Sequence, residues 1–288
     1  MLLLLACAGP AADDSAPAST CDSDVGAVET VASGLTGGTE GISFVNGTLY
    51  VTQSEAVLSI APDGTVSTLA KVSSALGLAP GVDTLLVAAP GEFTLDGSGK
   101  DGGVLRVGVD GSVETLLTGL PNPNFLAVSS TGTVLVSDDT NEVLWTLDGA
   151  EWLTGIPSPN GMAFSPDFST LYVVSTFTTD PPLWRVPVSG GTAGTPEEVA
   201  TLPTGSAPDG ITVDTDGNIW VAANVAGELV RITPDGDMET IAEDLPNPAS
   251  LAFGQGDWDP CSIYFTSLYG DTVGRVQVGV TGAALALP

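Results

Sequence analysis

The sequence predicts an all-β protein, a six-bladed β-propeller with four antiparallel strands in each blade. Six segments of the 288-residue chain begin a strand at one aligned position and carry apolar or small residues two and four places later. The aligned positions, called the column here, are Glu40, Ala75, Asn124, Asn160, Asp209 and Ala249. They lie 35 to 49 residues apart, the length of a four-stranded blade. The 36 Gly and 21 Pro also favour many short strands.

Each repeat supplies the four strands of its blade in order. The column segment is the innermost strand, because its period of two leaves one face buried. Apolar, β-branched runs predict second strands at residues 48–52, 84–88, 133–137, 170–175, 218–222 and 262–266. Third strands follow at residues 56–60, 104–109, 142–147, 183–188, 229–233 and 273–278. Asp-Gly hairpin turns at residues 63–64, 110–111, 148–149 and 235–236 then lead into fourth strands.

The N-terminal strand is expected to complete the last blade. Only a short tail follows residue 278, so the sixth repeat lacks an outer strand, and segment 26–32 has nothing else to pair with. The propeller domain is therefore expected to span residues 25–288. Its closure would bring Cys21 near Cys261, and we predict a disulfide between them; free or separately paired thiols are the alternative.

The first residues resemble an export signal. Leu4-Leu5-Ala6-Cys7 matches the lipobox of bacterial lipoproteins, although a basic stretch before it is missing. We expect residues 1–7 to be a truncated lipoprotein signal with lipidation at Cys7, and residues 8–24 to be a flexible tether. The protein would then be exported, either anchored to a membrane by lipid alone or periplasmic or extracellular. A cleaved or incidental apolar start is the alternative.

The composition excludes several functions. Six Lys and Arg against 35 Asp and Glu give a net charge of −29, which would repel nucleic acid, so no nucleic-acid partner is expected. The chain has no His, which rules out a Ser-His-Asp triad and an imidazole-bound zinc. Any acid or base must be a carboxylate or a water activated by a metal.

Four column residues carry side-chain oxygens and predict a metal site. Equivalent positions of the innermost strands meet at one mouth of a propeller's central tunnel. Two carboxylates and two amides there would hold one divalent cation, calcium first, with Zn²⁺, Mg²⁺ or Mn²⁺ as alternatives. A turn-capping role after proline is the other explanation of each Asn or Asp. Ala75 and Ala249 would either leave space for a ligand or be covered by loops.

Two segments carry a family resemblance. Pro159-Asn160-Gly161-Met162-Ala163-Phe164 and Pro208-Asp209-Gly210-Ile211-Thr212-Val213 resemble those of the senescence marker protein/gluconolactonase/regucalcin-like family of six-bladed propellers. The resemblance implies that Glu40, Asn160 and Asp209 hold one metal ion, with Asn124 nearby as a further ligand or substrate contact.

The resemblance also implies a metal-dependent hydrolase of the lactonase type. The metal would polarise the lactone carbonyl, and Asp209 would be the general base or the nucleophile. Family members that act on sugar lactones carry an arginine where this chain has Asn122. Asn122, Asn124, Asp138, its neighbour Asp139 and Phe177 are the candidate substrate contacts. We expect a monomer that acts on a small lactone or ester; an organophosphate hydrolase and a non-catalytic propeller that binds metal or ligand are the alternatives.

Overall fold

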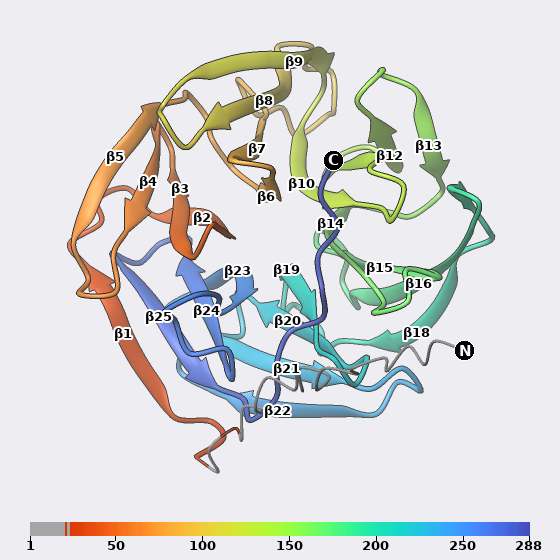
Figure 1. The fold of residues 1–288 in the computed structure, drawn as a ribbon. Helices are drawn as coiled ribbons and strands as arrows, with labels where there is room; N and C mark the ends of the chain where they lie inside the picture. The colour runs from red at the N-terminus through yellow and green to blue at the C-terminus, as the bar shows by residue number, and fades with distance from the viewer. Residues whose placement is uncertain (1–20, 22–23) are drawn as a thin grey trace, which may run out of the picture.

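The computed structural model describes Cys21 and residues 24–288, and it confirms the predicted six-bladed β-propeller (Figure 1). Six antiparallel sheets surround a central axis, and in each one the strand that begins at or near a column position is innermost. The described residues form strands and turns but no helix, and none of them forms a helix long and apolar enough to cross a membrane. The predicted lipobox with Cys7 and most of the tether lie outside the described residues.

The strands of the first three blades follow from the inside outward. Blade one consists of β2 (Thr39–Val45), β3 (Thr48–Gln53), β4 (Ala56–Ile60) and β5 (Val66–Lys71). Blade two consists of β6 (Leu78–Gly81), β7 (Thr84–Ala89), β8 (Gly102–Gly108) and β9 (Val113–Leu120). Blade three consists of β10 (Pro123–Val128), β11 (Val134–Asp138), β12 (Val143–Thr146) and β13 (Glu151–Thr154).

The other three blades repeat the same order. Blade four consists of β14 (Pro159–Phe164), β15 (Thr170–Ser175), β16 (Pro182–Ser189) and β18 (Glu197–Thr201), with the short β17 (Thr192–Ala193) paired to the end of β16. Blade five consists of β19 (Pro208–Val213), β20 (Ile219–Ala223), β21 (Glu228–Ile232) and β22 (Met238–Ala242). Blade six consists of β23 (Pro248–Phe253), β24 (Ser262–Ser267), β25 (Thr272–Gln277) and β1 (Val28–Ser33).

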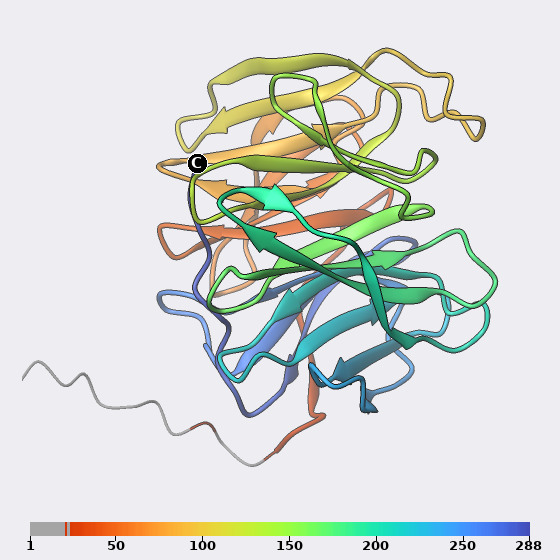
Figure 2. The ribbon, with the colours of Figure 1, turned by 90° about the vertical axis from the view of Figure 1, so that its right-hand side faces the viewer.

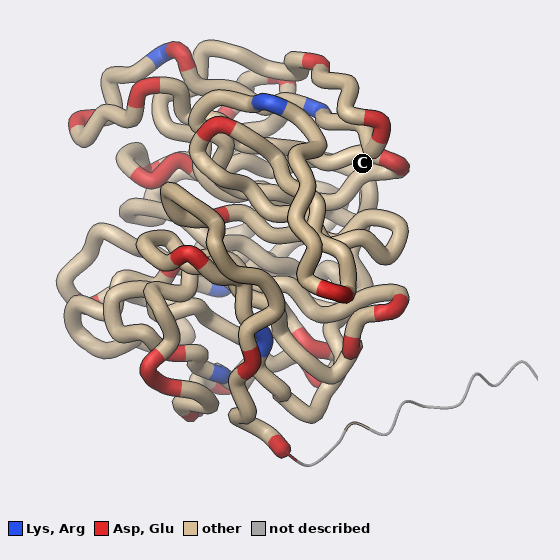
Figure 3. The backbone as a smooth tube through the Cα atoms, turned by 90° about the vertical axis from the view of Figure 1, so that its left-hand side faces the viewer, with Lys and Arg blue, Asp and Glu red and all other residues tan. Residues whose placement is uncertain are grey.

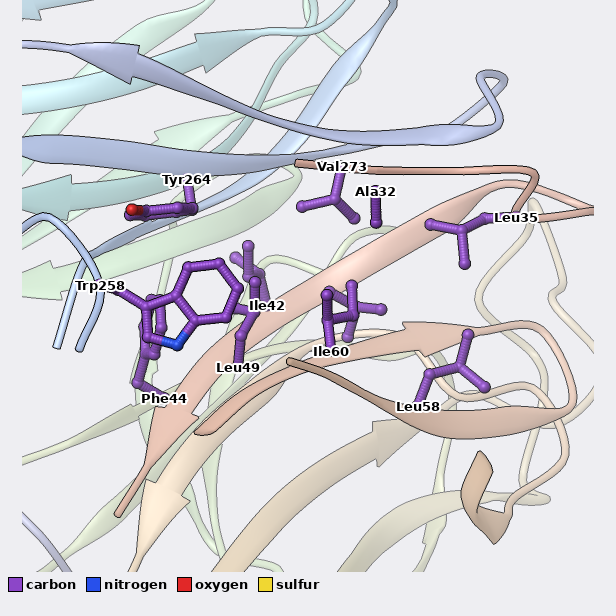
Figure 4. Packing of buried hydrophobic residues seen from close by; sticks show 11 residues of the cluster. Ala32, Leu35, Ile42, Phe44, Leu49, Leu58, Ile60, Trp258, Tyr264 and Val273 are labelled. Atoms are coloured by element: carbon purple, nitrogen blue, oxygen red, sulfur yellow. The ribbon is translucent and has the colours of Figure 1, made fainter. Parts of the chain in front are cut away.

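The last blade is closed by the N-terminal strand, as predicted. Strand β1 pairs antiparallel with β25, and a disulfide joins Cys21 to Cys261, whose Cα atoms lie 5.5 Å apart. A buried cluster fills the junction between blades six and one (Figure 4). Within it the rings of Phe44, Trp258 and Tyr264 meet edge to face with centroids 5.3 to 5.8 Å apart, a favourable aromatic geometry. The first and last blades are therefore held by strand pairing, a covalent bond and packing together.

Removing the disulfide is expected to lower the free energy of unfolding by about 2 to 4 kcal/mol, because the bond closes a loop of most of the chain and restricts the unfolded state. The comparison is a denaturant melt of the wild type and the Cys21→Ser/Cys261→Ser variant. The pairing of β1 with β25 should keep the variant folded. Identical midpoints would show that this bond adds no stability.

The C-terminal segment crosses one mouth of the tunnel (Figures 1 and 2). The backbone N–H of Ala283 donates to the carbonyl of Val213, and that of Thr215 to the carbonyl of Thr281. Beneath the segment is a cavity of about 210 Å³, lined mainly by apolar residues from the far ends of the innermost strands and by residues 281–286. None of the column residues lines it, so this cavity is at the opposite mouth from the predicted site.

Candidate metal and active site

The predicted ring residues all occupy the second position of an innermost strand, inside a β-bulge. Glu40 lies in β2, Asn124 in β10, Asn160 in β14 and Asp209 in β19. In each strand the column residue and the one after it face a single residue of the neighbouring strand. Such a bulge leaves the extra residue without a ladder partner and changes the direction of its side chain. The bulges therefore explain how residues of an otherwise regular sheet present polar groups at the tunnel mouth.

The residue after three of the column positions is a glycine because the next blade lies against it. A Cβ on Gly41 or Gly161 would meet the carbonyl oxygen of Leu76 or Asp209, and one on Gly210 would come within 2.7 Å of the Ser250 Cα. Only a residue without a side chain permits this backbone approach. The innermost strands thus contact one another directly at the bulges, which fixes the spacing of the ring.

Hydroxyl groups on the second strands tie these bulges together. The Thr52 hydroxyl accepts a hydrogen bond from the Gly41 N–H at 2.7 Å and donates to the carbonyl of Leu76 in blade two at 2.7 Å. Thr266 accepts from the Ser250 N–H and donates to the carbonyl of Glu40 in blade one. Buried backbone groups left free by the bulges are satisfied in this way, and adjacent blades are joined at the level of the ring.

Burial and mutual repulsion dominate the electrostatics of the ring. Burial, followed by the charges of Asp209 and Asp139, raises the pKa of Glu40 well above its usual value. Burial raises the pKa of Asp209 to about 7, although a hydrogen bond from the Asn160 side chain acts in the opposite direction. Asp209 is 7% exposed, whereas Glu40 is partly exposed at the mouth. Clustered carboxylates that repel one another are stabilised by a cation, which would favour their ionised forms.

The buried oxygens of the ring fit a hard cation. Among the described residues, four buried side-chain oxygens lack a hydrogen-bond partner, and two of them, Asn160 Oδ1 and Asp139 Oδ1, belong to this mouth. An unsatisfied buried oxygen is costly unless a donor or a cation meets it. No three Asp, Glu or Cys side chains of the described chain converge closely enough to hold a metal by themselves. A cation here would therefore need the amide oxygens as well as Glu40 and Asp209.

The structure separates the two neighbouring aspartates of blade three. Asp138 ends β11 and accepts hydrogen bonds from the backbone N–H groups of Thr140 and Asn141 and from the Trp145 indole, so it stabilises a turn. Asp139 lies in the turn after β11 and has a different partner. Its Oδ2 accepts a hydrogen bond from Asn124 Nδ2 at 2.6 Å. Asp139 is thus at the ring, and Asp138 is not.

Two other candidate substrate contacts, Asn122 and Phe177, make no hydrogen bond to a ring residue. Asn122 is 1% exposed; its side chain accepts from the Thr94 N–H at 3.1 Å and donates to the Thr94 carbonyl at 2.7 Å, which anchors the long loop of blade two. The side chain of Phe177 is 61% exposed at the end of blade four. Ala75 and Ala249 are buried at 1% and 0% exposure, so neighbouring residues cover them and leave no opening above them.

No arginine elsewhere in the chain replaces the one that the family resemblance implies at position 122. The four arginines of the chain each pair with a glutamate between the two outer strands of a blade: Arg106 with Glu114, Arg185 with Glu197, Arg231 with Glu239 and Arg275 with Glu29. Figure 3 shows acidic residues spread over the surface and few basic ones.

One residue of the site was missed from the sequence. Asn224 follows β20 and is 5% exposed; its Nδ2 lies 3.5 Å from Asp209 Oδ2 and 3.1 Å from the carbonyl oxygen of Pro248. It occupies the position in blade five that Asp139 occupies in blade three, because Pro123 pairs with Asp138 and Pro208 with Ala223. Aligning the residues that follow the second strands would have revealed it.

The raised pKa of Asp209 predicts how stability depends on pH in the absence of a cation. The folded value of about 7 lies above the usual 3.8, so the fold binds the extra proton between these values. This contribution is fully present below pH 3.8 and is lost as the pH rises through about 7. In chelator, the Tm of the wild type should therefore fall more between pH 5 and pH 8 than the Tm of Asp209→Asn. Equal falls in Tm would contradict the raised pKa of Asp209.

Comparison with known proteins points to the same family as the sequence. Residues 145–268 match the family described as SMP-30/gluconolactonase/LRE-like region, a stretch that includes Asn160 and Asp209. The chain is 33% identical over 144 residues to pentonolactonase of Haloferax volcanii, covering 49% of this chain and 47% of that protein. It is 34% identical over 112 residues to 6-deoxy-6-sulfogluconolactonase of Pseudomonas putida, covering 38% and 37%. The matches thus span less than half the length of these relatives.

Solved structures confirm the architecture. A gluconolactonase of Xanthomonas campestris superposes with a TM-score of 0.73 at 21% identity, over 87% of this chain and 89% of that one. A calcium-binding regucalcin of Agrobacterium tumefaciens gives a TM-score of 0.72 at 19% identity, over 91% and 97%. At these identities the likeness is one of fold. Together with the sequence match, it identifies the chain as a six-bladed β-propeller related to the SMP-30/gluconolactonase/LRE-like family.

Proposed function

We propose that the protein is a lactone hydrolase that depends on a divalent cation, most simply calcium, bound by Glu40, Asn124, Asn160 and Asp209. The observation that carries the proposal is the ring itself. Two carboxylates and two amides from four different blades meet at one tunnel mouth, where the Asn160 oxygen is buried without a partner. Relatives named as lactonases and a calcium-binding structural neighbour support the same assignment.

Asp209 is the residue best suited to handle the proton of the reaction. Burial raises its pKa to about 7 without a cation, and a bound cation would favour the ionised form that a general base requires. The Asn160 side chain acts to lower this pKa, and Asn224 Nδ2 lies 3.5 Å from Asp209 Oδ2, so two amides neighbour the carboxylate. When bound, the cation would supply Lewis-acid polarisation of the lactone carbonyl.

A propeller fold does not by itself distinguish a hydrolase from a binding protein. The test is turnover of pentono- and hexonolactones, an aliphatic lactone and a phosphotriester, each measured with calcium and with chelator. We expect chelator-sensitive opening of a lactone. Phosphotriester turnover alone would support the organophosphate alternative, and calcium binding without any turnover would support a non-catalytic propeller.

A further inference from the structure

Blades three and five carry the same pair of side chains in reversed order. In blade five the column residue is Asp209 and the residue after the second strand is Asn224; in blade three these positions hold Asn124 and Asp139. In both blades the amide nitrogen faces the carboxylate, at 3.5 Å in blade five and 2.6 Å in blade three. Exchanging the two residues therefore preserves one carboxylate and one amide at the mouth.

Asp139 differs from the other buried aspartates of the chain. Asp214, at 0% exposure, accepts hydrogen bonds from the backbone N–H groups of Asp216 and Asn218 and from the Trp220 indole, and Asp138 is satisfied by its own turn. Asp139 is 4% exposed, and its Oδ1 has no partner. A buried carboxylate oxygen without a donor is unfavourable unless a cation compensates for it.

The free oxygen of Asp139 belongs to the ring and not to the blade around it. The charge of Asp139 raises the pKa of Glu40, and the charge of Asp209 raises the pKa of Asp139. Glu40, Asp139 and Asp209 come from blades one, three and five, which alternate around the tunnel (Figure 1). The acidic groups are thus distributed around the axis, which explains why they do not form a compact cluster.

We propose that Asp139 is the third carboxylate of the cation site, oriented by Asn124, so that the site carries three negative charges instead of two. This inference rests on the proposed function, because it concerns the same cation. Asn124 Nδ2 holds Asp139 Oδ2, which leaves Asp139 Oδ1 free to face the ion through one water. The added charge increases the affinity for calcium.

The test is calcium binding by titration calorimetry on the full chain after treatment with chelator. Asp139→Asn is expected to weaken binding about 10- to 100-fold, the loss typical of groups that support a metal site. The exchanged variant Asn124→Asp/Asp139→Asn copies the order of blade five and should recover most of the affinity. The control Asp180→Asn removes an exposed charge from the loop after β15 and should leave the affinity almost unchanged.

The outcomes separate this inference from the proposed function. If the wild type bound no calcium, the cation dependence of the proposed function would fail. If the wild type and Asp139→Asn bound calcium equally, the function would stand and the role of Asp139 would be overturned. If Asp139→Asn lost cooperative melting, its loss of calcium binding would not be interpreted, and the exchanged variant would decide. Failure of the exchanged variant to recover any calcium affinity would also overturn the proposal.

Discussion

Asp209→Asn is expected to reduce kcat/KM for the best lactone substrate by about 10²- to 10⁴-fold, the usual contribution of a positioned acid or base. The substitution keeps the shape of the side chain but removes its charge and its ability to take a proton. Because Asp209 is 7% exposed and lies next to Asn160, bulk water cannot easily replace it. Initial rates under saturating calcium would measure the effect and separate it from weaker metal binding.

A matched substitution controls for the loss of one charge from an already acidic protein. Asp216 is exposed in the hairpin between β19 and β20, at the other end of the same strand, and Asp216→Asn should retain wild-type rates. If Asp209→Asn kept more than about a tenth of the wild-type kcat/KM, the base would have to be another group. Asp139 would then be the next residue to test, because its buried Oδ1 has no hydrogen-bond partner.

The fold could be predicted because the buried strand faces and the turns require the same types of residue at the same positions in successive repeats. Buried faces of the innermost strands need apolar residues at every second place, as Ile42 and Phe44 or Ile211 and Val213 show. Asp-Gly turns at fixed distances mark the outer hairpins. The weakest repeat is also where the structure departs most, since β6 begins at Leu78, three residues after Ala75.

The shared strand position of the four column residues could be predicted, but the roles of the residues around them could not be distinguished from sequence. Two adjacent aspartates at the end of β11 have opposite roles, and which one faces the tunnel depends on the register of a strand next to a bulge. A shift of one residue moves every side chain to the other face. Asn122 likewise matched the position of a substrate contact, yet its hydrogen bonds hold the loop at Thr94. Such distinctions need the partners of each side chain.

Calcium is expected to stabilise the wild type strongly, because it binds the folded ring and not the unfolded chain. At a free concentration of 100 times Kd, the gain is about 2.7 kcal/mol, which corresponds to a rise in Tm of about 5 to 10 °C for a domain of this size. The rise should be larger at pH 8 than at pH 5, because the raised pKa values of Glu40 and Asp209 favour the protonated form of both groups at the lower pH.

Glu40→Gln should remove most of this calcium-dependent rise, since one of the two ring carboxylates predicted from the column is lost. In chelator the same variant should melt at the wild-type temperature or above it, because burial and the charges of Asp209 and Asp139 disfavour an ionised Glu40. The two measurements thus have opposite signs, which a simple packing defect at position 40 would not produce. An equal calcium-induced shift in wild type and variant would place the ion away from this mouth.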